Sequence, residues 1–155
     1  MNSKTDRADV VQNSDTIVQE IEIRQPAEEI FEAMTNPDEL VKWWRVEGKF
    51  RVTTMESDFS VGGKWRMRLI GGRGNETVVT GQYREIVRPR LVVFTWVRET
   101  EDVIETQVRW DLSEKDGVTT VRVTHSGLTT EGLRKRNEGW PMILGLLQAY
   151  VEETK

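Results

Sequence analysis

Hydrophobic and polar positions alternate along most of this chain, which is the period of strands with one buried face. Residues 16–24 show it first: Ile17, Ile21 and Ile23 share one face, and Val18 lies on the other face among acidic residues. Clusters of turn-forming residues recur every 8 to 12 positions afterwards, which is typical of antiparallel meanders. The pattern therefore predicts further strands at 50–55, 64–70, 76–87, 91–98, 103–112 and 118–126.

Two short helices are predicted between the first two strands. The first begins at Pro26, which suits the opening position of a helix because that position needs no N–H donor. Asn36 is a suitable N-cap for the second helix, which runs to about Trp43-Trp44. The first helix has an apolar stripe that we expect to be buried, made of Ile30, Phe31 and Met34.

The C-terminal segment gives the strongest indication of the architecture. From Trp140 to Val151, apolar residues recur at spacings of three, four and seven, which predicts one long amphipathic helix. A lone helix after antiparallel strands buries its stripe across the sheet, and a sheet that curls around it leaves a cavity. We therefore predict an α+β domain in which a curved antiparallel sheet of about six to seven strands wraps the long C-terminal helix.

Composition limits the functions that remain. The 155 residues carry a net charge of −4, so no basic field favours nucleic acid. The chain has no cysteine and one histidine, which leaves no thiolate or paired-imidazole metal site; we expect neither metal nor cofactor. No apolar run is long enough for a membrane span or a signal peptide, so a cytoplasmic location is expected. Residues 1–14 are predicted to be a disordered polar tail, followed by a single domain over 15–155.

Several short segments stand in a fixed order within residues 16–153: 26–31 (Pro-Ala-Glu-Glu-Ile-Phe), 38–44 (Asp-Glu-Leu-Val-Lys-Trp-Trp), 58–65, 81–86, 89–96, 124–128 (Thr-His-Ser-Gly-Leu) and Gly139-Trp140. In this order and spacing the chain resembles the START-related helix-grip superfamily, also called SRPBCC. Within it, the chain is similar to the branch named after the activator of Hsp90 ATPase.

The resemblance implies the helix-grip fold and a link to stress response, but it leaves the function open, because this fold hosts small-molecule binders, cyclases and co-chaperone domains. Eukaryotic co-chaperones that resemble the chain carry a separate N-terminal domain, whereas about 14 residues precede the domain here. A chaperone partner is therefore expected less than a small apolar or aromatic molecule. An open edge strand also makes a homodimer plausible.

Most residues that we expect in a ligand-binding cavity are aromatic or apolar. They are Trp65, Met67, Tyr83, Glu85, Trp96, Trp110, His125, Trp140 and Leu144. Flat rings can wall a cavity for an aromatic ligand, and the alternative is that the same rings simply fill the core. Trp43 and Trp44 are neighbours on a helix end, so we expect one of them to be exposed or to cover a cavity entrance.

Two ionisable residues of this set each allow two interpretations. His125 follows the inward alternation of its strand, so it is either a polar anchor for a ligand or a structural histidine with satisfied hydrogen bonds. Glu85 shares a face with Tyr83 if no bulge intervenes, and it could then be a general base or a buried, arginine-paired structural acid. No catalytic residue is assigned, because neither residue has an identifiable chemical partner.

The sequence thus predicts non-catalytic binding of a hydrophobic or aromatic ligand between the sheet and the last helix. The alternatives are a cyclase or dehydratase in the same cavity, using Glu85 or His125, and a co-chaperone interaction module. Residues 127–139 are predicted to form a glycine-rich loop that gates the cavity. The basic run 134–136 is predicted to be a solvated part of that loop.

Overall fold

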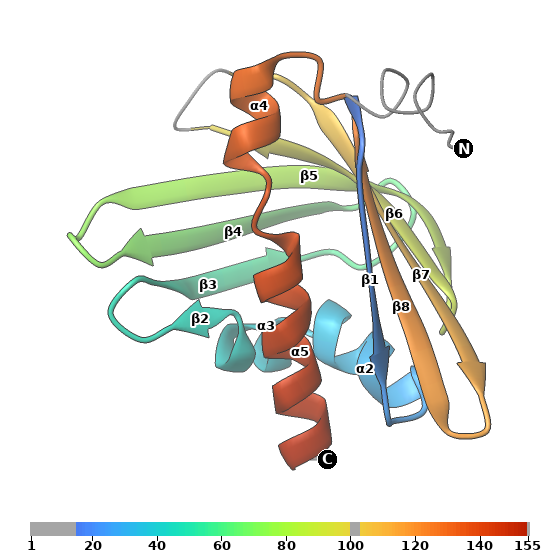
Figure 1. Ribbon diagram of the computed structural model, residues 1–155. Coiled ribbons are helices and arrows are strands. Elements are labelled where there is room, and N and C mark those ends of the chain that lie inside the picture. Colours follow the sequence, from blue (N-terminus) through green and yellow to red (C-terminus); the bar gives the residue numbers. More distant parts are fainter. Residues whose placement is uncertain (1–14, 100–102, 155) are drawn as a thin grey trace, which may run out of the picture.

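The computed structural model describes residues 15–99 and 103–154 (Figure 1). The predicted polar tail, 1–14, lies outside the described residues. The elements follow one another as β1 (Ile17–Ile23), α2 (Ala27–Thr35), α3 (Pro37–Trp43), β2 (Arg45–Val46), β3 (Phe50–Ser57), β4 (Lys64–Gly71), β5 (Glu76–Val87), β6 (Leu91–Arg98), β7 (Thr106–Lys115), β8 (Val118–Ser126), α4 (Glu131–Arg136) and α5 (Trp140–Thr154).

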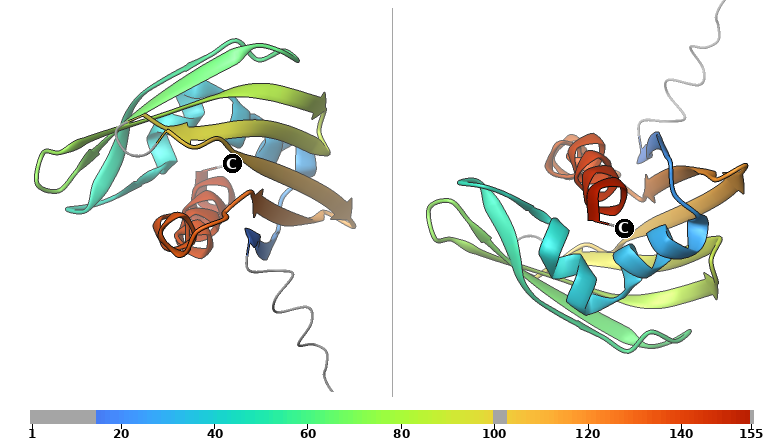
Figure 2. Two further views of the ribbon diagram at one scale, coloured as in Figure 1. Left: turned by 90° about the horizontal axis from the view of Figure 1, so that it is seen from above. Right: turned by 90° about the horizontal axis from the view of Figure 1, so that it is seen from below.

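The strands form one curled sheet in which neighbouring strands run antiparallel. Its order is β1-β8-β7-β6-β5-β4-β3-β2, so the chain's first strand pairs with its last and β1 and β2 are the edges. Figure 2 shows the sheet bent into an open trough, with α5 lying along the concave side. The predicted helix-grip architecture is therefore confirmed. No helix within the described ranges is long and apolar enough to cross a lipid bilayer.

The concave face and α5 bury the main core. Ile143, Leu144, Leu147 and Val151 of α5 are almost completely buried, as the helical spacing predicted. Burial of a side chain of this size stabilises the fold by about 1.5–3 kcal/mol. The stripe thus fixes α5 on the sheet.

The helix pair α2–α3 closes the lower end of the trough (Figure 1). The Glu114 carboxylate accepts a hydrogen bond from the Ala27 N–H at 2.8 Å and so caps α2 from the end of β7. The side chain of Asn36 accepts from Asp38 N–H at 2.9 Å, as expected for an N-cap of α3. Pro26 is the residue before α2 rather than its first residue.

Three local predictions need correction. The sheet has eight strands, because the two residues of β2 add a short edge strand. Residues 131–136, predicted as loop, form α4, which Thr130 caps by accepting from Leu133 N–H at 3.1 Å. Trp43 and Trp44 are both buried and stack at 5.4 Å between ring centroids. Both rings can point inward because Trp44 lies beyond the end of α3, with ψ of 75°.

Candidate ligand-binding site

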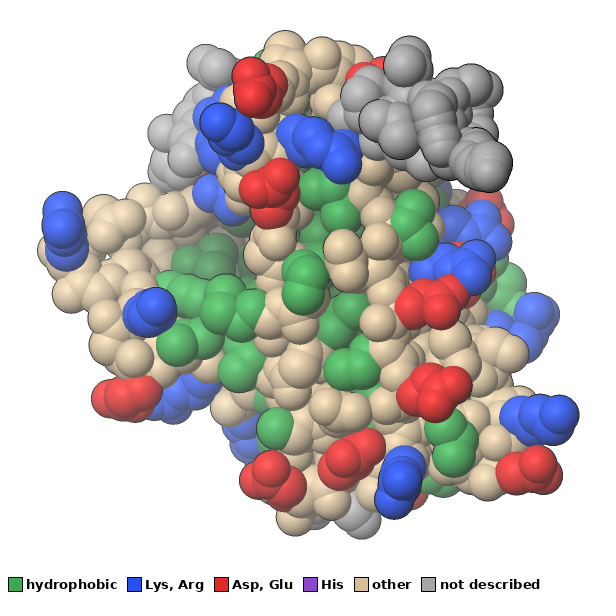
Figure 3. Space-filling view, viewed as in Figure 1, with side chains coloured by type: hydrophobic (Ala, Val, Ile, Leu, Met, Phe, Trp, Pro, Cys, Tyr) green, Lys and Arg blue, Asp and Glu red, His purple; other side chains and the backbone are tan. Residues whose placement is uncertain are grey.

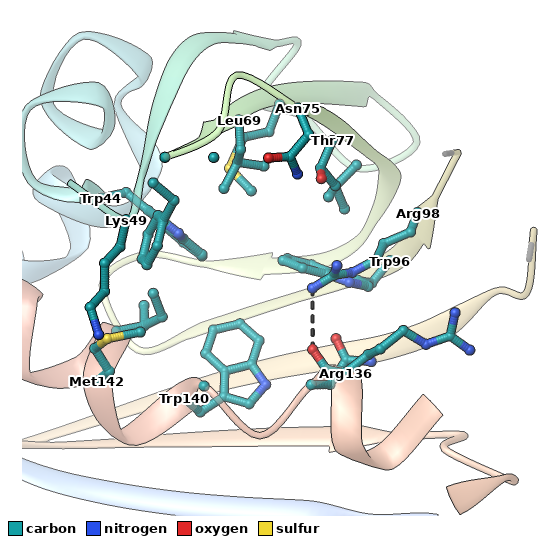
Figure 4. Close-up of a pocket in the computed structure, with 18 of the residues that line it drawn as sticks. Trp44, Lys49, Leu69, Asn75, Thr77, Trp96, Arg98, Arg136, Trp140 and Met142 are labelled. Atoms are coloured by element: carbon teal, nitrogen blue, oxygen red, sulfur yellow. Dashed lines mark hydrogen bonds between the residues drawn. The ribbon is translucent and has the colours of Figure 1, made fainter. Parts of the chain in front are cut away.

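A cavity of about 390 Å³ opens between the sheet and the junction of α4 with α5. In Figure 3 it is the hydrophobic recess beside α5, toward the hairpins β2–β3 and β4–β5. Leu69 and Thr77 come from the sheet and face Trp140 across it (Figure 4). Val79 of the sheet and Ile143 of α5 line it as well. The volume falls within the range of small-molecule sites, which are mostly apolar with a few polar groups.

Three indole rings make the inner wall of the cavity: Trp44, Trp96 and Trp140. Trp140 meets Trp44 edge-to-face, with ring centroids 6.1 Å apart, and Trp96 at 5.7 Å. Contacts of this kind contribute about 0.5–1.5 kcal/mol each beyond the area they bury. The rings therefore hold one another in place and present flat apolar surface to a ligand.

Behind this wall, His125 is completely buried and both of its ring nitrogens are engaged. The Trp140 indole N–H lies 3.1 Å from His125 Nδ1, and because an indole nitrogen only donates, Nδ1 must accept. A neutral ring then carries its proton on Nε2, which donates to Thr106 Oγ1 at 2.7 Å. That hydroxyl donates in turn to the Trp96 carbonyl at 3.1 Å.

Burial, aided by the positive charge of Arg98, lowers the pKa of His125 from 6.5 to about 4. The ring is therefore neutral near pH 7, as this chain of hydrogen bonds from Trp140 through His125 and Thr106 to the Trp96 carbonyl requires; we call it the relay. Its hydrogen bonds link two walls of the cavity, one through Trp140 and the other through the backbone of Trp96.

A second, smaller void of about 40 Å³ lies deeper, between α2–α3 and the sheet. Met67, Trp44 and Trp96 line both spaces. The buried indole N–H groups of Trp65 and Trp96 have no hydrogen-bond partner within the described residues.

The structure brings most of the predicted site residues to one region but at different depths. Met67, Trp96 and Trp140 line the large cavity. Trp65, Tyr83 and Trp110 line the smaller void. The Tyr83 hydroxyl shares a hydrogen bond of 2.7 Å with Ser57, and burial raises the pKa of Tyr83. His125 and Leu144 lie in the core behind the walls and line neither space.

Glu85 does not lie where alternation placed it. The pairing of β5 with β6 shifts register between Tyr83 and Glu85, so Tyr83 faces the concave side opposite Phe94 while Glu85 stands opposite Val93. Glu85 is consequently exposed, and Ile86 takes the inward position against the core. The expectation that Glu85 shares the face of Tyr83 was wrong because of this bulge.

Several lining residues were not predicted from the sequence. Leu69 follows Trp65 and Met67 on the inward face of β4, so the same alternation could have identified it. The sequence left open which of Trp43 and Trp44 would be exposed or cover a cavity entrance, and it is Trp44 that lines the cavity. Asn137 and Arg98 come from segments without a clear apolar period, and no sequence signal pointed to them.

The family described as Activator of Hsp90 ATPase homolog 1-like protein matches residues 24–152. The chain belongs to this family. The match runs from the end of β1 to the last turns of α5, so it includes the cavity and the relay behind it. No curated protein matches the chain in sequence.

Solved structures share the fold of this family member. Protein CV1439 from Chromobacterium violaceum is 22% identical, with a TM-score of 0.76, over 89% of this chain and 97% of that chain. Ms6760 from Mycobacterium smegmatis is 18% identical, with a TM-score of 0.78, over 92% and 94%. The Aha1 dimer from Colwellia psychrerythraea is 22% identical, with a TM-score of 0.69, over 90% and 98%. At these identities the likeness extends to the fold alone.

Proposed function

We propose that this family member binds a small apolar or aromatic molecule in the cavity between the sheet and α5, without catalysing a reaction. The observation that carries the proposal is the 390 Å³ space walled by Trp44, Trp96 and Trp140. A ring-sized ligand that buries roughly 100–150 Å² of apolar surface gains roughly 2–4 kcal/mol at ~25 cal/mol per Å². Micromolar affinity needs more than one ring or a good polar match.

The state of the two residues considered for proton transfer supports binding over catalysis. His125 uses both nitrogens inside the core and lines neither space. Glu85 is exposed on the outer face. A general acid or base must come within hydrogen-bond reach of its substrate, and neither residue meets that condition for a ligand in the cavity.

Binding can be tested with phenylnaphthylamine, a neutral dye that fluoresces strongly in apolar sites. We expect saturable binding to the wild-type protein at micromolar concentration. The variant T77F places a ring in the cavity and should weaken binding at least tenfold while the melting temperature stays within a few degrees. Thr80 lines a different depression, on the outer face of β5, so T80F is the matched control. Absence of saturable binding, or equal loss in both variants, would refute the proposal.

A homodimer is proposed on the open edge of β1, where Val18 is exposed. The dimer of the Colwellia protein makes the proposal worth a measurement. Light scattering across a concentration series should give twice the monomer mass of 18.0 kDa. The variant V18K should have the monomer mass. A constant monomer mass at all concentrations would rule it out.

A further inference from the structure

The charged side chains around the cavity are of one sign. Its lining residues include the basic residues Lys49, Arg73 and Arg98, with Arg136 lining it by its backbone, and no aspartate or glutamate is among the described residues that line it. The whole chain is acidic, with 26 acidic against 22 basic residues. The distribution around the cavity therefore runs against the composition of the protein and favours an anion near the cavity.

Arg98 is the basic residue best placed to reach a ligand. Its side chain is half-buried, and Figure 4 shows the guanidinium extending over Trp96 toward the cavity. One guanidinium N–H donates to the Arg136 carbonyl at 3.2 Å, which fixes the direction of the group. Its charge is felt in the interior, since it helps to lower the pKa of the buried His125.

Lys49 and Arg136 differ in what they can offer. Figure 4 shows Lys49 across the cavity from Arg98, beside Met142, where its exposed ammonium flanks the opening. The side chain of Arg136 points away from the cavity, and its Nε donates to the Gly132 carbonyl at 3.2 Å. Arg136 therefore contributes backbone to the lining, and it is a natural control for Arg98.

We propose that the ligand is an amphipathic anion, whose ring or chain lies against the indole wall and whose carboxylate or similar oxyanion is bound by Arg98, with Lys49 as the second cation. This inference rests on the proposed binding function and adds the charge of the ligand to it. A guanidinium at an apolar wall suits this role because it is weakly hydrated and presents several donors to an oxyanion.

The test compares two dyes that share a ring system. Anilinonaphthalene sulfonate carries an anionic group, and phenylnaphthylamine lacks it. We expect the sulfonate to bind the wild-type protein about tenfold more tightly, the effect of one charge-assisted hydrogen-bonded contact. Raising the ionic strength from about 0.02 M to about 0.5 M should reduce this preference and leave the neutral dye unaffected.

Variants then locate the source of the preference. The preference is the ratio of the affinities for the two dyes, measured for each variant. R98Q should abolish most of this ratio, and K49Q should reduce it two- to threefold. R136Q makes the same change in net charge and should leave the preference intact. K49Q alters an exposed side chain, so it remains informative if R98Q fails to fold.

The outcomes separate the two proposals. Equal affinity for both dyes, or a preference that survives R98Q and K49Q as it survives R136Q, overturns the anion inference while the binding function stands. If neither dye binds the wild-type protein, the binding function is overturned and the inference falls with it.

Discussion

The buried histidine should make the stability of this protein depend on pH in a defined window. Unfolding exposes His125, which then takes up a proton near pH 6.5, whereas the folded protein takes it up only near pH 4. Between these values the unfolded state binds more protons, so the free energy of unfolding falls as the pH falls. Above this pH window, His125 makes its full contribution to the free energy of unfolding.

The magnitude follows from the two pKa values. Protonation of His125 in the unfolded chain should lower the free energy of unfolding at about pH 5 by about 2 kcal/mol relative to about pH 7.5. The limit for a shift from 6.5 to about 4 is ~3 kcal/mol, reached below the folded pKa. A change of this size is a substantial part of the stability of a domain, and it is readily measured.

The assay is urea unfolding followed by tryptophan fluorescence, for the wild-type protein and for H125Q at both pH values. The glutamine side chain of this variant would keep a donor toward Thr106 but cannot titrate, so carboxylate effects common to both proteins cancel. The wild-type protein should lose about 2 kcal/mol more than H125Q on acidification. The cross-check uses the fact that the chain has one histidine. Its single ring signal in an NMR titration should show a pKa of about 4 in the folded protein. Equal losses of stability in the two proteins on acidification, or a folded pKa of His125 near 6.5, would refute the conclusion that His125 is buried and neutral within the relay.

Three further predictions concern the same wall and its supports. T106V leaves the Nε2 proton of His125 without an acceptor and should cost about 1–3 kcal/mol in urea unfolding, while T106S keeps the hydroxyl and most of the stability. In G81A the new methyl group would clash with the backbone carbonyl oxygen of Thr95 and meet the Trp65 ring at 2.6 Å, so it should cost about 1–3 kcal/mol or more. G145A adds a methyl group in open space on α5 and should raise stability by up to about 1 kcal/mol. W140F keeps an aromatic ring in the wall but gives up the bond to His125, so affinity for phenylnaphthylamine should fall severalfold; unchanged affinity would mean that the relay does not position the wall.

Alternation of polar and apolar residues was enough to predict most of the sheet because most of its long strands bury one face and expose the other. The last strands and α5 follow the pattern closely, with Val121, Val123 and His125 all inward on β8. β2 was missed because two residues show no period. α4 was missed because only Leu133 of its six residues is buried, so no apolar stripe marks it; Thr130 as a possible cap was the available signal.

The site was less predictable than the fold because it depends on departures from regular geometry. The bulge after Tyr83 arises from how β5 pairs with β6, and nothing within β5 alone announces it. Trp44 can line the cavity because α3 ends at Trp43, the residue before it, so the backbone of Trp44 is no longer helical. Alternation indicates the face of a side chain but gives no measure of its depth, so rings of the cavity and of the core beneath it were predicted as one set.

Two tryptophans at and beside the cavity wall are held by hydrogen bonds on the side away from the cavity. Trp140 donates to His125 behind the wall, and Trp43, which stacks on Trp44, donates to the buried Ala33 carbonyl at 2.9 Å. For the Trp140 indole to turn inward and fill the space, its buried N–H and the His125 acceptor would lose each other, at a cost of about 1–3 kcal/mol for each group left unsatisfied. A polar group placed in the core thus serves the apolar wall, because His125 keeps the Trp140 ring at the edge of the space.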